Sequence, residues 1–382
     1  MDEPRNLAVF IAVIAARLFV PLAIPKYPIP AGIAALVIDG VDQTVFQTLT
    51  TLDLAGYQSY DKALDVYYLA IAYLSTLRNW TNLPAFAMSR FLFYYRLVGS
   101  LLFEVTNVRA LLLLFPNTFE YFFLFYEGVR LRWNPKRMSV ATVIGGAFAI
   151  WVFIKVPQEY WIHIAQFDVT DTIKSRIFGV PLDTPWSAIV SDFLAVWIGV
   201  VVALIASIVG ARLAVGRYLP PADWSFSFNV DAHGRDVTEE EAAAAMRGDA
   251  RRLFDVELFE KFALVTLMTI IFSQILTGLR ATIVQTAIGV GLIVLANTAV
   301  SEWFVRRGVT WQSVVVEFLV MAVTNVLAAV VFAIVLPIGG GGIDIPSTLF
   351  VLLLLTLLVT LYDRFRPYYE VRLMRSREAG GG

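Results

Sequence analysis

The sequence predicts an all-α fold: a polytopic transmembrane helical bundle of ten or eleven spans with a small cytoplasmic hairpin-helix insert. The first observation is composition. Of the 382 residues, 58% are hydrophobic and only 16% are charged, whereas soluble proteins are about 45–50% apolar and about 25% charged. The second observation is that the apolar residues occur in runs of about 20, which is long enough to cross a bilayer.

Ten stretches are predicted as membrane spans from their apolar content. They cover residues 7–24, 63–79, 85–106, 108–130, 138–156, 186–214, 257–278, 281–300, 311–338 and 346–363. An eleventh candidate, residues 29–52, contains Asp39, Asp42 and Gln43. Because these side chains are costly in lipid, this stretch is predicted either to span, to re-enter or to lie at the interface.

A polar segment divides the chain into two membrane blocks. Residues 1–217 form the first block, 218–256 the insert, 257–366 a second block of four spans, and 367–382 a tail. Within the insert, the alternation of polar and apolar residues over 225–230 predicts a short hairpin. Thr238 and Glu241 have the spacing of a capping box, which predicts the start of a helix.

The distribution of basic residues predicts the orientation. Lys and Arg concentrate in residues 130–137, in the insert, at 306–307 and in 364–377. Because basic loops stay on the cytoplasmic side, these segments and the C-terminus are predicted to be cytoplasmic in a plasma-membrane protein. Counting backwards along the chain places the acidic stretch 50–62 outside.

Five charged residues in two consecutive spans predict ion pairs. Arg109, Glu120 and Glu127 are 11 and 7 residues apart, so a continuous helix would place them within roughly 20° of one another. Arg90 and Glu104 lie in the preceding span. Antiparallel packing would then pair Glu104 with Arg109 and Arg90 with Glu127, either to fix the packing or to serve a site.

Arg96 is the strongest candidate for contact with a ligand. It lies near the middle of its span. Within the two antiparallel spans 85–106 and 108–130 it has no obvious partner apart from Glu120, which lies at a similar depth. Its five donors suit a carboxylate or a phosphate. The predicted substrate-binding residues are therefore Arg96, Arg90, Arg109, Glu104, Glu120 and Glu127.

Four aspartates form a second candidate site. Asp39 and Asp42 are three residues apart, and Asp61 and Asp65 are four apart, so each pair shares a face if its segment is helical. Two facing pairs would offer oxygen ligands to a divalent cation such as Mg²⁺, or would provide the catalytic carboxylates of an enzyme. The alternative is a solvated acidic loop.

The same region resembles part of the acidic signature of CDP-alcohol phosphatidyltransferases. Asp39-Gly40, followed by Gly56, Asp61 and Asp65, is similar to D-x-x-D-G-x-x-A-R and G-x-x-x-D-x-x-x-D. Leucine stands where the first aspartate of that signature is expected, and Gln-Thr replaces its Ala-Arg pair. The resemblance implies a metal-dependent transferase that acts on a phospholipid or lipid-linked substrate.

Three functions follow from these features, and composition excludes others. The balance of 30 basic and 31 acidic residues argues against nucleic-acid binding, and with no Cys and two His a His/Cys metal centre is not expected. A transporter for an anionic or small polar solute or ion ranks first, then the membrane transferase, then a scaffold with a protein partner at residues 218–256. Membrane lipids are the expected surroundings in each case, and the oligomeric state is left open.

Overall fold

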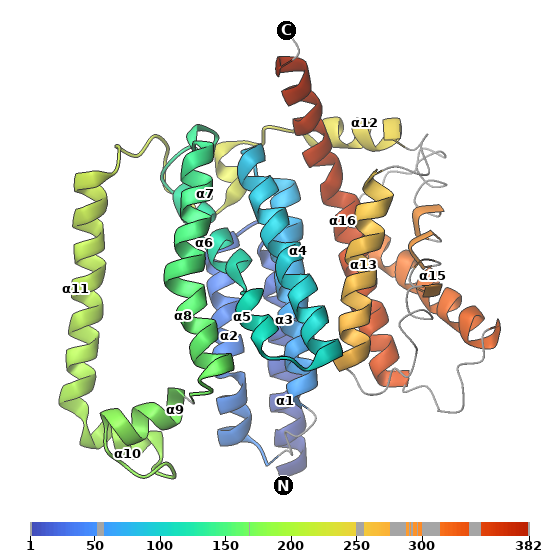
Figure 1. The fold of residues 1–382 in the computed structure, drawn as a ribbon. Coiled ribbons are helices and arrows are strands. Elements are labelled where there is room, and N and C mark those ends of the chain that lie inside the picture. Colours follow the sequence, from blue (N-terminus) through green and yellow to red (C-terminus); the bar gives the residue numbers. More distant parts are fainter. Residues whose placement is uncertain are drawn as a thin grey trace.

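In the computed structural model, the regular secondary structure in the part of the chain that the structure describes is all helical, with no strand there (Figure 1). This confirms the predicted all-α class. The described residues are 2–51, 57–167, 169–249, 256–275, 314–335 and 345–380, together with parts of 288–299. The predicted span 281–300 lies largely outside them.

The helices alternate between long rods and short pieces. Their bounds are α1 Asp2–Phe19, α2 Pro28–Leu49, α3 Tyr57–Asn79, α4 Leu83–Thr106, α5 Ala110–Leu114, α6 Thr118–Arg130, α7 Val140–Ala149, α8 Val156–Glu159, α9 Val169–Thr172, α10 Trp186–Asp192, α11 Leu194–Tyr218, α12 Glu239–Asp249, α13 Val256–Ile275, α15 Val314–Val335 and α16 Ile345–Gly380.

Within the described residues, five helical stretches are long and apolar enough to cross a membrane. They are Glu3–Ala23, Pro28–Leu49, Val140–Ile164, Leu194–Ala214 and Thr348–Ala379. The second of these is the doubtful stretch 29–52, which forms one continuous helix up to Leu49 in spite of its aspartates. The third continues the predicted span 138–156 through π-helical turns as far as Ile164.

The predicted span 108–130 is not a single helix. It consists of α5, with five residues, and α6, with 13. Pro116 lies between them, and a proline lacks the N–H that a helix interior needs and clashes with the preceding turn. The break lies against α4, where a Cβ added to Gly99 would be 2.1 Å from Cβ of Phe115. Glycine at position 99 therefore permits this close approach.

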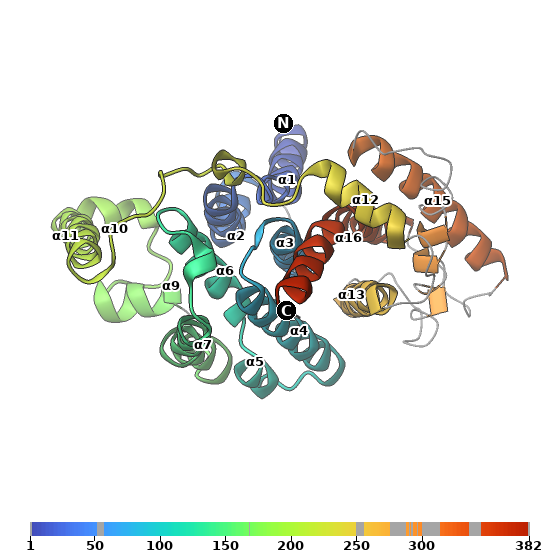
Figure 2. The ribbon, with the colours of Figure 1, turned by 90° about the horizontal axis from the view of Figure 1, so that it is seen from above.

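Helix α3 lies at the centre of the bundle, among α2, α4, α6 and α16 (Figure 2). Its aromatic side chains form much of the core. The rings of Tyr73 and Phe93 stack with centroids 4.4 Å apart, and Trp80, just beyond the end of α3, stacks on Tyr126 at 3.8 Å. The apolar interior is thus continuous around α3.

Buried ion pairs join α13 to α16 in the second block, and a hydrogen bond from Tyr73 connects them to the first block. Glu260 on α13 accepts hydrogen bonds from Arg366 on α16 and from the hydroxyl of Tyr73 on α3, both at 2.6 Å. Lys261 pairs with Asp363 at 2.7 Å. Removing one partner of such a buried pair leaves an uncompensated charge, so these contacts fix how α3, α13 and α16 lie against one another.

The insert contains the predicted helix but not the predicted hairpin. Thr238 and Glu241 form a reciprocal capping box, with N–H to side-chain oxygen distances of 2.8 and 3.2 Å, at the start of α12. Residues 225–230 form no strand, and that prediction is wrong. Side chains satisfy the backbone here instead: His233 Nε2 lies 2.6 Å from the Ser225 carbonyl, and its ring stacks on Trp224.

The predicted span 186–214 is divided between α10 and α11, and α11 stands apart from the bundle (Figures 1 and 2). None of the apolar window in Leu194–Ala214 is buried. A helix that is apolar all round is suited to lipid or to a protein partner rather than to water.

Candidate functional site

The four predicted aspartates meet on one arginine. Arg17, near the end of α1, directs Nη2 to Asp39 at 2.6 Å and to Asp65 at 2.5 Å. Its Nη1 contacts Asp42 and Asp61. Two aspartates come from α2 and two from α3, so three helices converge at this point.

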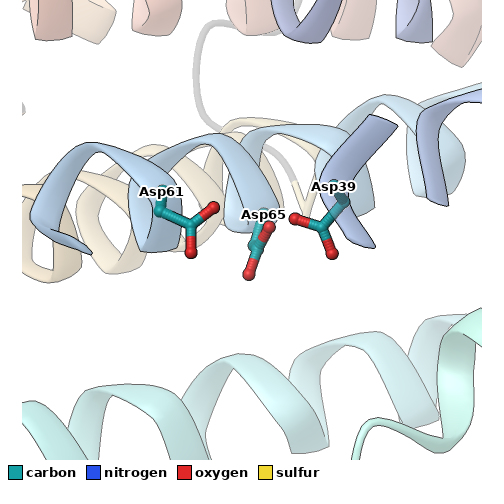
Figure 3. A group of neighbouring side chains, drawn as sticks. All are labelled: Asp39, Asp61 and Asp65. Atoms are coloured by element: carbon teal, nitrogen blue, oxygen red, sulfur yellow. The ribbon is translucent and has the colours of Figure 1, made fainter. Parts of the chain in front are cut away.

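Figure 3 shows three of these carboxylates, those of Asp39, Asp61 and Asp65, turned toward one another. One ligand oxygen from each lies within 4.8 Å of the others, a spacing that would suit a single divalent cation. Arg17 contacts the same three carboxylates, so a cation bound there would compete with its guanidinium. Arg17 was not predicted, although it is the only charged residue within the predicted span 7–24.

A cavity of about 450 Å³ adjoins this cluster. Side chains from α1 to α4, from α6 and from residues 155–163 line it. Tyr68 is one of them. Its side chain is buried, and its hydroxyl interacts with the carboxylate of Glu120, another residue of the lining.

The far wall of the cavity carries charged residues that were not predicted. Glu159 lies 2.9 Å from His163 Nε2 and 3.8 Å from Lys155 Nζ. It also accepts a hydrogen bond from the Asn117 backbone N–H at 3.2 Å. The four-residue spacing of 155, 159 and 163 places them on one helix face, a pattern that can be read in the sequence. Lys155 and His163 lie in the π-helical turns on either side of Glu159, and such turns often occur at functional sites.

Arg96 lies at the helix break. Its Nη1 donates to the Phe115 carbonyl at 3.1 Å, an oxygen left free because Pro116 interrupts the helix. Glu120, the alternative partner considered from the sequence, instead accepts a hydrogen bond from the Asn117 side chain at 3.0 Å. Arg96 therefore reaches the cavity with a charged group that no carboxylate neutralises by direct contact among the described residues.

Both ion pairs predicted between the spans 85–106 and 108–130 are wrong. Glu104 pairs with Lys62 at 3.3 Å, while Arg109 lies at the start of α5. The prediction assumed one continuous helix from 108 to 130, and the break between α5 and α6 rotates the charged positions out of a single stripe.

The pair predicted at the other end of these two spans, Arg90 with Glu127, is also absent. Arg90 faces α13 and lies 3.8 Å from Glu260. Glu127 pairs with Arg130 at 2.6 Å and accepts a hydrogen bond from Trp80 at 2.8 Å. Glu127 and Trp80 belong to the core, whereas the Arg90 side chain is 39% exposed.

The structure thus gathers part of the predicted set. Asp39, Asp65, Arg96, Glu104 and Glu120 line the cavity, and Asp42 and Asp61 adjoin it through Arg17. Arg90, Arg109 and Glu127 lie elsewhere.

The part of the chain that the structure describes is thus a helical bundle in which five helices are long and apolar enough to cross a membrane, with a cavity between helices that carries charges of both signs. Comparison of the chain with known protein families, with curated proteins and with solved structures finds no match.

Proposed function

We propose that this chain is a multi-pass integral protein of the plasma membrane with a cytoplasmic C-terminus, and that it transports a small anionic or polar solute through the cavity beside Arg96. The helix break between α5 and α6 is the observation that carries the proposal. Broken helices at a charged cavity are typical of secondary transporters, where the interrupted backbone lies beside the solute.

The charges of the cavity support the same function. Arg96 and Lys155 offer cationic groups, and a charged group this deep in an apolar bundle normally marks a solute or ion pathway. The Arg17 cluster contributes four carboxylates against one guanidinium. A cation would be attracted to this excess of negative charge, and cation-coupled uptake of an anion would use both halves of the site.

The experiment is electrical recording from proteoliposomes on a solid-supported membrane, with concentration jumps of phosphate, succinate and glutamate as probes. We expect a transient current with at least one probe. Arg96→Gln should abolish it and Arg96→Lys should retain part of it. Arg132→Gln, which removes an exposed charge outside the cavity, is the matched control. No current from the unaltered chain with any probe would refute the proposal.

A metal-dependent membrane enzyme acting on a phospholipid or lipid-linked substrate is the second candidate. The metal-sized spacing of Asp39, Asp61 and Asp65 favours it, and His163 held by Glu159 has the arrangement of an oriented base. This candidate predicts that Mg²⁺ or Mn²⁺ raises the thermal stability of the chain and that Asp61→Asn removes the effect. An unchanged melting temperature with either ion would exclude it.

A protein partner at residues 218–256 stays a prediction. In this structure the insert binds its own chain, with Arg372 and Arg375 of α16 holding Asp236 and Glu241.

A further inference from the structure

A second cavity, of about 430 Å³, lies at the opposite end of α3 from the aspartate cluster. Four separate stretches build it: the end of α3, residues 130–136 after α6, residues 224–237 of the insert, and α16. Asp61 and Arg78, near the two ends of α3, are 17 residues apart, which is about 25 Å along a helix. The two cavities are therefore distinct.

Ion pairs form the frame of this second cavity. Asp231 accepts hydrogen bonds from Arg78 and Arg235, each at 3.0 Å, and Asp236 accepts one from Arg372 at 2.9 Å. Burial alone would raise the pKa of Asp231 and Asp236, but the hydrogen bonds from these arginines outweigh burial and lower both pKa values. Three of the arginines are thus already engaged in holding the insert on the bundle.

The side chains that line the second cavity carry a net positive charge. Five basic side chains and two carboxylates line the cavity. Arg130 has a buried partner behind it in Glu127, at 2.6 Å, which uses one of its two terminal nitrogens. Lys136 is exposed at the mouth, and its ammonium has no hydrogen bond or ion pair within the part of the chain that the structure describes.

Polar and aromatic groups complete the walls. Thr81 and Asn134 add polar side chains to the lining. Trp224 and His233 stack with ring centroids 4.3 Å apart and give one wall a flat surface. A volume of about 430 Å³ lies in the size range of small-molecule sites, which is about 300–1,000 Å³.

We propose that this cavity is a binding site for a phosphate-bearing anion, with Lys136 and Arg130 as its direct contacts. Phosphate suits the site because lysine and arginine both form strong charge-assisted hydrogen bonds to its oxygens, and because its charge exceeds that of one carboxylate. The arginines paired with Asp231 and Asp236 supply the surrounding positive potential. The phosphate belongs either to a soluble ester or to a lipid headgroup.

A substitution of Lys136 distinguishes ligand binding by the cavity from a purely structural role of its charged residues. The pairs that hold the insert do not include Lys136, so Lys136→Gln leaves the frame intact. Arg132→Gln is the matched control: it removes the same charge from the same loop, at an exposed side chain that does not line the cavity.

The test uses the full chain and two probes. Calorimetric titration with inorganic pyrophosphate, in a zwitterionic detergent, measures binding of a soluble phosphate. Thermal unfolding in nanodiscs of phosphatidylcholine, with and without phosphatidic acid, measures binding of a headgroup. One charge-assisted hydrogen bond is worth about 1.5–3 kcal/mol, so Lys136→Gln should weaken pyrophosphate binding about tenfold or more, and Arg132→Gln less than about twofold.

The outcomes are distinguishable. Pyrophosphate binding that depends on Lys136 supports the site with a soluble ligand. Stabilisation by phosphatidic acid alone, lost in Lys136→Gln, supports it with a lipid headgroup. Absence of binding in both arms, or an equal effect of the Lys136 and Arg132 substitutions, overturns the proposal.

Discussion

Replacing Arg17 tests whether the aspartate cluster depends on one cation. The side chains of Arg17 and Asp42 are only 5% and 3% exposed, so this pair is almost fully desolvated. Breaking a buried pair by removing one partner costs about 3–5 kcal/mol. The other three carboxylates are between 36% and 47% exposed. Solvent screens them, and each contributes about 0–1 kcal/mol.

One guanidinium serves all four carboxylates, so these contributions do not add in full. We expect Arg17→Gln to lower the free energy of unfolding by about 4–5 kcal/mol. Arg17→Lys should lower the free energy of unfolding by less, because an ammonium keeps the positive charge. Some loss is still expected, because an ammonium cannot make two forked contacts at once. The measurement is unfolding in increasing dodecyl sulfate, followed by the fluorescence of the nine tryptophans.

A double-mutant cycle identifies the interaction responsible. Combined with Asp42→Asn, Arg17→Gln should cost less than the sum of the two single changes, with a coupling energy of about 2 kcal/mol or more. A loss below about 1 kcal/mol for Arg17→Gln, or a coupling near zero, would refute the argument that burial makes this pair strong.

Three other predictions concern packing, capping and pH. Gly99→Ala should cost about 1–3 kcal/mol because the added methyl group meets the helix break, whereas Gly210→Ala on α11 should change stability by less than about 0.5 kcal/mol in the same unfolding assay. Thr238→Ala should cost α12 about 1 kcal/mol, seen as faster hydrogen exchange of that helix. Since the folded pKa values of Asp231 and Asp236 are lowered, their contribution is present above the unfolded pKa of about 3.9 and is lost as pH falls through the lower folded values. Exchange of α12, corrected for its intrinsic rate, should therefore stay constant from pH 8 to 5 and rise only in stronger acid.

The helical class and the grouping of the four aspartates could be predicted because they depend on local pattern. Apolar runs indicate helices, and the three- and four-residue spacings place Asp39 beside Asp42 and Asp61 beside Asp65. The cation that pairs with these aspartates is determined by the packing of α1 against α2 and α3. The pattern of residues along the sequence does not contain that information. Arg17 was missed for this reason.

The prediction of ion pairs between the spans 85–106 and 108–130 failed for a different reason, which was visible in the sequence. Pro116 interrupts the stretch 108–130, and angular arithmetic across it has no meaning because the helix does not continue. The partners actually found for Arg90 and Glu104 lie on other helices, so even a correct helix boundary would have excluded the pairs without supplying the new ones.

The position of α16 has a consequence for the order in which the chain assembles. Arg372 donates to the carbonyl oxygens of Leu77 and Arg78, at 2.9 and 2.6 Å, and so caps the last turn of α3. The second of these contacts spans 294 residues of sequence. At about 5–20 residues synthesised per second, α3 is complete roughly 15–60 s before its cap exists.

During that interval α3 carries an uncovered face and unsatisfied carbonyl groups in its last turn. A ribosome that stalls before residue 372 would leave this face open to proteases and to wrong partners. Synthesis of α16 thus determines when the earlier helices finish folding, and the arrival of Arg372 becomes the checkpoint for quality control.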